Sequence, residues 1–137
     1  MILPYTKSKG SRGSEVRFRP FIDIILTLGT KTYSTKALLD TGADCTLVNK
    51  GIGKLLRVDF SKCKEGSTRW VNGPPLKTWL QTLDLEVENL PESRKTVEIG
   101  FVESPNVGIL LGHTGFFENF MVKFETYQLT FEIEARP

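Results

Sequence analysis

Residues 37–44 read Ala37-Leu38-Leu39-Asp40-Thr41-Gly42-Ala43-Asp44. The apolar run stops at Leu39 and turn-forming residues follow at once, which predicts a buried strand that ends in a tight turn. Gly42 permits such a turn because it has no Cβ. A carboxylate at the end of an apolar strand has low-dielectric surroundings, which suit Asp40 to catalysis. For the tripeptide 40–42 alone, the alternative is an Asx turn, in which the side chain of Asp40 bonds its own backbone.

Short segments of apolar and β-branched residues surround this motif, with turn formers between them, and this pattern is typical of an all-β domain. The segments expected to form strands are 21–28, 32–39, 46–48, 68–71, 76–80, 83–87, 97–101 and 107–112. Two further strands are expected on either side of a change in alternation at 125–127.

The pair Asn72-Gly73 predicts a tight hairpin turn between two of these strands. Pro74 and Pro75 follow it and cannot donate to a strand ladder, so the hairpin must lie at an edge or project from the sheet. Residues 113–120 are expected to hold one short helix, because their aromatic side chains would share one buried face.

Composition indicates one soluble domain, since 137 residues with 39% hydrophobic and 25% charged residues lie in the usual range for a single domain. No apolar run reaches the roughly 20 residues of a membrane-spanning helix, and no secretory signal is visible. We therefore expect no membrane partner and a cytoplasmic chain. Cys45, Cys63 and a single histidine cannot complete a four-ligand zinc site without carboxylates, so we expect no metal.

Basic residues gather near the N-terminus, where residues 1–20 hold five basic residues against one acidic residue. The stretch 7–14 is rich in Gly and Ser and has no apolar residue to anchor it. We therefore expect residues 1–15 to be a flexible basic leader and residues 16–137 to be a single domain. A basic arm can contact nucleic acid, but a solvated leader is the favoured interpretation and nucleic acid is not expected as a partner.

Residues 37–44 resemble the active-site segment of the retropepsins, the aspartic proteases of the retroviral type. Three further segments agree in order: Arg19-Pro20 before the first long strand, the Asn72-Gly73 hairpin at the position of the family's flap, and the apolar segment 109–112 near the C-terminus. The resemblance implies a closed, small β-barrel-like retropepsin (acid protease) fold with a flap hairpin and one short C-terminal helix.

The resemblance also implies an aspartic endopeptidase, a hydrolase that needs no metal or organic cofactor. Such an enzyme uses two carboxylates that share one proton. This chain has a single Asp-Thr-Gly, so an active site requires a homodimer with Asp40 and its symmetry mate at the axis. The substrate would be an extended peptide or a polyprotein, and a chain released from a polyprotein would belong to a virion or retroelement particle.

Roles follow from the resemblance residue by residue. Asp40 would be catalytic, Thr41 would brace the two loops across the axis, and Gly42 would accept close backbone approach. Ala43 and Asp44 would line the substrate groove. The flap, roughly 69–77, would cover the peptide, and its substrate-binding residues are expected to be Trp70, Val71, Asn72 and Gly73.

This chain departs from the family at His113, where an arginine is common. That arginine pairs with the position of Asp44, so His113 is expected either to pair with Asp44 here or to be a water-exposed residue at the start of the helix. The prolines beside the flap stiffen it. Two alternatives therefore stay open: a retropepsin fold that serves as a catalytically weak or inactive dimerisation or binding module, and an unrelated β domain whose basic arm binds nucleic acid. The segment 127–134 either contributes to the dimer interface or is an ordinary edge strand.

Overall fold

The computed structural model describes residues 1–9, 15–69 and 73–137. Within these ranges the strands are β1 (Ile2–Pro4), β2 (Thr6–Lys9), β3 (Val16–Arg19), β4 (Phe21–Leu28), β5 (Lys31–Leu39), β6 (Leu47–Asn49), β7 (Lys64–Thr68), β8 (Leu76–Val87), β9 (Lys95–Val102), β10 (Ile109–Leu111), β11 (Phe120–Glu125) and β12 (Thr130–Ala135). The helical segments are α1 (Lys50–Leu55) and the 3₁₀ turns η1 (Phe60–Lys62) and η2 (Thr126–Gln128).

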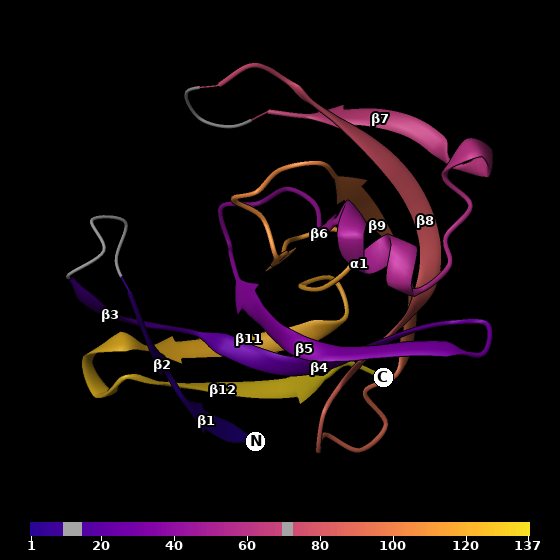
Figure 1. The fold of residues 1–137 in the computed structure, drawn as a ribbon. Coiled ribbons are helices and arrows are strands. Elements are labelled where there is room, and N and C mark those ends of the chain that lie inside the picture. The colour runs from indigo at the N-terminus through magenta and orange to yellow at the C-terminus, as the bar shows by residue number, and fades with distance from the viewer. Residues whose placement is uncertain (10–14, 70–72) are drawn as a thin grey trace.

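Six strands form a closed barrel (Figure 1). They follow one another in the order β4-β5-β10-β6-β9-β8, and pairing of β4 with β8 closes the ring. The pairs β5–β10 and β6–β9 are parallel, whereas the other pairs around the ring are antiparallel. The all-β class and the closed retropepsin-like barrel that the sequence predicted are therefore confirmed.

The barrel is filled by side chains that alternate along its strands. In β4, Ile22, Ile24 and Leu26 are buried while Asp23 between them is exposed. Such a period of two places one face of each strand in the core. β8 is buried in the same way at Leu83, Leu85 and Val87.

The strands β7 and β8 form the expected hairpin, which arches over the barrel in Figure 1. Their ladder runs from Lys64↔Leu80 to Thr68↔Leu76, so the connection spans 69–75. That connection is longer than the two-residue turn predicted from Asn72-Gly73. Asn72 itself lies outside the described residues.

A second sheet of order β1-β12-β11 lies against the barrel, below it in Figure 1. Phe131 and Ile133 of β12 belong to the same buried cluster as the barrel strands. β12 pairs with β1 on one side and with β11 on the other. β12 is therefore central in its sheet, so the interpretation of the segment 127–134 as an ordinary edge strand is wrong. Whether this segment contributes to a dimer interface stays a prediction.

The start of the chain differs from the flexible leader expected over 1–15. β1 pairs with β12, and β2 pairs with β3 as a projecting hairpin. Tyr5 helps to hold this segment, because its ring lies 6.1 Å from that of Phe131 and its hydroxyl lies 2.8 Å from Oγ1 of Thr126. These partners are more than 100 positions away in sequence, so local composition could not indicate them. Whether residues 1–15 form a separable leader stays a prediction.

The short helix expected over 113–120 is wrong. These residues form successive turns, with Phe117 N–H bonded to Gly112 O at 3.1 Å and Glu118 N–H bonded to His113 O at 3.1 Å. Gly115 has a φ of +94°, which a right-handed helix cannot contain. The α-helix of the described residues is instead α1, whose N-terminus is capped by the side chain of Asn49. No helix in the described ranges is both long and apolar enough to cross a bilayer.

Candidate active site

Asp40 follows directly on β5, whose last residue, Leu39, is buried. The parallel pairing of β5 with β10 places Leu39 opposite Leu111. The N–H of Asp40 then donates to the carbonyl of Leu111 at 3.0 Å, which continues the ladder by one residue. Asp40 is consequently held at the rim of the barrel by two strands that are distant in sequence.

The loop after Asp40 is fastened to residues 112–114. His113 N–H donates to Ala43 O at 3.0 Å, and Thr114 N–H donates to Asp44 O at 2.9 Å. Gly112 is required at this crossing, because a Cβ there would collide with the backbone carbonyl of Cys45. The two segments therefore lie against each other, backbone to backbone, in a single arrangement.

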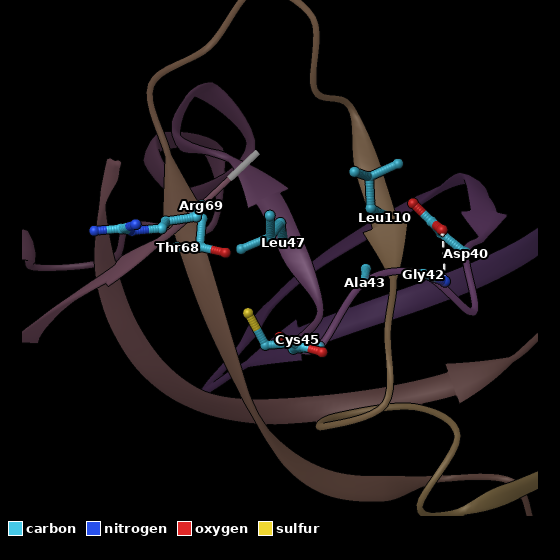
Figure 2. A pocket seen from close by; sticks show the side chains of 9 residues that line it. Asp40, Gly42, Ala43, Cys45, Leu47, Thr68, Arg69 and Leu110 are labelled. Atoms are coloured by element: carbon cyan, nitrogen blue, oxygen red, sulfur yellow. Dashed lines mark hydrogen bonds between the residues drawn. The ribbon is translucent and has the colours of Figure 1, made fainter. Parts of the chain in front are cut away.

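The carboxylate of Asp40 accepts a hydrogen bond from the N–H of Gly42, with 3.0 Å between Gly42 N and Oδ1 (Figure 2). This is the Asx-turn geometry that was the alternative interpretation of the tripeptide. Here it is compatible with a catalytic role, because it orients one carboxylate oxygen and no other described residue donates to this group. Asp40 itself is only half-buried, so its carboxylate can meet solvent or substrate.

A cavity of about 230 Å³ opens beside Asp40. Figure 2 shows Asp40 and Leu110 on one side of it and Thr68 with Arg69 on the other. The remaining lining residues are Gly42, Ala43, Asp44, Cys45 and Leu47. The end of β7, which begins the hairpin, thus shares one cavity with the loop that carries the carboxylate.

The structure brings together four of the residues that the sequence singled out. Asp40, Gly42, Ala43 and Asp44 all line the cavity. Thr41 is exposed at the tip of the loop and is not part of the lining.

The predicted substrate-binding residues of the flap are not among the described residues that line the cavity. Gly73 is exposed and does not line the cavity. Trp70, Val71 and Asn72 lie outside the described residues, so their part in substrate binding stays a prediction.

Sequence reasoning missed four residues of the lining: Cys45, Leu47, Thr68 and Leu110. Leu110 lies in the apolar segment 109–112 that had been noted, and Cys45 follows the motif directly. Burial raises the pKa of the Cys45 thiol, and the nearby charge of Asp44 adds to the rise, while a hydrogen bond with the side chain of Thr68 opposes both. Cys45 and Thr68 line the same cavity, Cys45 from the loop that carries Asp40 and Thr68 from the end of β7.

His113 does not make the expected ion pair with Asp44 in the described part of the chain. Its Nε2 lies 2.7 Å from the carbonyl oxygen of Thr41 instead. The ring packs against Phe117, with 5.6 Å between the ring centroids. An imidazole is shorter than an arginine side chain, so it reaches the near backbone of the loop.

Metal ligands do not gather at this site or elsewhere in the described residues, where no group of three or more His, Cys, Asp and Glu side chains could hold an ion.

Comparison with known proteins rests on structure. No family model and no curated protein matches this chain in sequence. Among solved structures it is similar to the crystal structure of a retropepsin-like aspartic protease from Rickettsia conorii, with a TM-score of 0.62 over 98% of each chain and 17% sequence identity. Agreement of this kind over nearly the full length of both chains concerns the fold. The chain therefore has the fold of a retropepsin-like aspartic protease.

Proposed function

We propose that this chain is an aspartic endopeptidase that acts as a homodimer. The observation that carries the proposal is the position of Asp40, a half-buried carboxylate directly after the buried end of β5, oriented by Gly42 N–H and open to a cavity bounded by the hairpin. The fold it shares with a retropepsin-like aspartic protease supports the same activity.

The reaction requires two carboxylates close enough to share one proton, because two like charges at about 3 Å cannot both ionise. The ionised carboxylate takes a proton from a bound water, whose oxygen attacks the carbonyl carbon of the scissile bond. The protonated carboxyl donates to the carbonyl oxygen as the tetrahedral intermediate forms. In the next step each carboxyl changes role: the one that took the water proton gives it to the leaving nitrogen as the C–N bond breaks, and the other takes back a proton from the hydroxyl of the intermediate.

The second carboxylate comes from a second copy of the chain, since the sequence contains one Asp-Thr-Gly. Thr41 and Gly42 are exposed at the tip of the loop, where a twofold-related loop can approach. Gly42 suits this approach because it adds no side chain at the axis. In the dimer, Thr41 would meet its symmetry mate, as the family resemblance implies.

The substrate is an extended peptide or polyprotein segment that lies between the loop and the hairpin. Ala43 and Asp44 border the cavity on the loop side, and Thr68 and Arg69 border it on the hairpin side. Leu47 and Leu110 provide apolar surface for a substrate side chain, while backbone groups of an extended chain can bond by strand addition. The flap, roughly 69–77, would cover the bound peptide, as the family resemblance implies.

The test is cleavage of an unstructured peptide library at several pH values by wild type, Asp40→Asn and Asp23→Asn. Asp23 is exposed on the outside of β4 and pairs with Lys36 at 3.0 Å, which makes it a matched control for loss of one carboxylate. We expect Asp40→Asn to lose at least about 10³-fold in kcat while the fold and the dimer persist. Asp23→Asn should cleave as wild type does.

Cleavage by Asp40→Asn at the wild-type rate would contradict the dyad. A wild-type dimer that binds peptides without cleaving any would instead establish the alternative, a binding or dimerisation module.

A further inference from the structure

The peptide unit between Thr41 and Gly42 is held at both of its ends. Its carbonyl oxygen, on Thr41, lies 2.7 Å from Nε2 of His113. Its N–H, on Gly42, donates to Oδ1 of Asp40 at 3.0 Å. Because a peptide unit is planar, the direction of its carbonyl also sets the direction of its N–H.

The direction of proton donation follows from the chemistry of the two groups. A carbonyl oxygen has lone pairs only, so the imidazole must supply the hydrogen of this bond. His113 therefore carries a hydrogen on Nε2, in the neutral or in the charged ring. The ring of His113 packs against Phe117, with 5.6 Å between the ring centroids. The backbone N–H of His113 donates to Ala43 O at 3.0 Å, which fixes the backbone that carries the ring.

Backbone bonds hold the loop on either side of this peptide unit. The segment 111–114 bonds Asp40 N–H at 3.0 Å, Ala43 O at 3.0 Å and Asp44 O at 2.9 Å. Between Asp40 and Ala43, the described segment 111–114 bonds to the loop through the side chain of His113. This bond acts on the same peptide unit whose N–H meets the carboxylate, within a turn that Ala43 N–H also closes onto Asp40 O at 3.1 Å.

We infer that His113 is a positioning residue for Asp40, acting through the Thr41–Gly42 peptide. Its Nε2–H holds the carbonyl, and the same peptide then presents its N–H to the carboxylate. Hydrogen bonds in series polarise one another, so the donor at one end strengthens the bond at the other. The kinetic consequence rests on the proposed function, whereas the hydrogen-bond chain does not.

Two substitutions separate the hydrogen bond from the bulk of the side chain. His113→Phe keeps a ring against Phe117 but has no donor, whereas His113→Gln carries an N–H at about the reach of Nε2. We expect the Gly42 amide proton to move upfield in the NMR spectrum of His113→Phe and to stay near its wild-type shift in His113→Gln. We expect kcat to fall about five- to tenfold in His113→Phe with KM within about twofold, and to recover in His113→Gln.

The outcomes are distinguishable from those that test the proposed function. An unchanged Gly42 amide shift in His113→Phe overturns the inference, and so does a kcat that is equal in the two variants. Thermal unfolding of both variants checks that each is folded. A wild-type protein that cleaves nothing contradicts the proposed function, and the Gly42 shift then still decides whether His113 holds the peptide.

Discussion

Cys45 is a titratable residue of the cavity, and its surroundings shift the pKa of its thiol. Its thiol lies among Asp44, Leu47 and Thr68, on the loop that carries Asp40. Burial is the largest influence and raises the pKa of the thiol, so at neutral pH the thiol is protonated and a weak nucleophile. The Thr68 side chain lowers the same pKa and thereby favours the thiolate.

Thr68→Val is therefore expected to slow the reaction of Cys45 with iodoacetamide. Loss of the hydroxyl removes the influence that lowers the pKa, so the thiolate fraction at pH 8 falls and alkylation slows by about two- to threefold. The rate is measured by mass spectrometry of the peptide that contains Cys45. Cys63 in the same sample is an internal control, since its raised pKa results from burial and from Asp59. Equal alkylation rates of Cys45 in both proteins would contradict an influence of Thr68 on the pKa of its thiol.

At the level of single residues, the sequence could predict those residues of the site that are neighbours along the chain. Asp40, Gly42, Ala43 and Asp44 are neighbours along the chain, and the structure places all four at the cavity. Thr68 and His113 lie near the same loop but are distant from it in sequence, and no local sequence pattern indicates that they lie there. His113 was noticed, but its partner was not Asp44, because side-chain length decides which atom of the loop it meets.

Among the elements, the loop 40–46 and the segment 112–114 cross in close backbone contact. A Cβ on Gly112 would meet backbone atoms of Cys45 and, at 2.7 Å, the carbonyl of Ala43. Backbone atoms cannot rotate away as the end of a side chain can, so the two segments would have to separate. The position of Asp40 consequently depends on the absence of one methyl group.

Gly112→Ala is expected to lower the free energy of unfolding by about 1–3 kcal/mol and to reduce peptide cleavage. The measurement is urea unfolding followed by circular dichroism. Gly108→Ala is the matched control, because a Cβ at Gly108 has no heavy atom within 4 Å. Its free energy of unfolding should change by less than about 0.5 kcal/mol. Equal losses in the two variants would contradict the steric argument.

Element boundaries were predictable where alternation is continuous, as in β4, whose bounds match the expected 21–28. β8 was expected as two strands, 76–80 and 83–87. The structure shows one strand whose buried face changes between Thr78 and Leu83, as it passes from the hairpin into the barrel. Residues 113–120 do not form the expected helix, because the positive φ of Gly115 is incompatible with a helix even though the spacing of the aromatic side chains suits one.

For the molecule as a whole, the closed ring explains why one chain supplies only half of the proposed site. The ring surrounds one core and carries one Asp40 loop at its rim. Catalytic rate is then expected to depend on the concentration of chains, since dissociation separates the two carboxylates. Any dilution that favours the monomer should lower activity per chain.

Mixing wild type with Asp40→Asn tests this dependence directly. Random assortment of equal amounts gives wild-type, mixed and variant dimers at about 1:2:1, and a mixed dimer has one carboxylate at its axis. Activity per wild-type chain should therefore fall to about half. Adding the same amount of Asp23→Asn should cause no such fall. A mixture with Asp40→Asn that keeps full wild-type activity would show that each chain works alone.

The overall topology was only partly predictable. Most strands are visible in the sequence, but closure by β4–β8 depends on the twist of the sheet, which no local pattern reports. The expectation that they close into a small barrel came from resemblance to a family, and the solved structure that shares the fold supports it. Pairing of β1 with β12 had no local signal at all, because its two strands lie at opposite ends of the chain.

That last pairing has a consequence for protein synthesis. During translation, β1 is synthesised before any other strand described here and β12 after all of them. At about 5–20 residues per second, the interval between the synthesis of β1 and that of β12 is roughly 6–25 s. During this time β1 is a nascent strand without its neighbour. Its three residues and its proline, Pro4, leave few donors for pairing with a neighbouring nascent chain. The barrel strands all emerge first, so the sheet that joins the two ends can be completed only once β12 has left the ribosome.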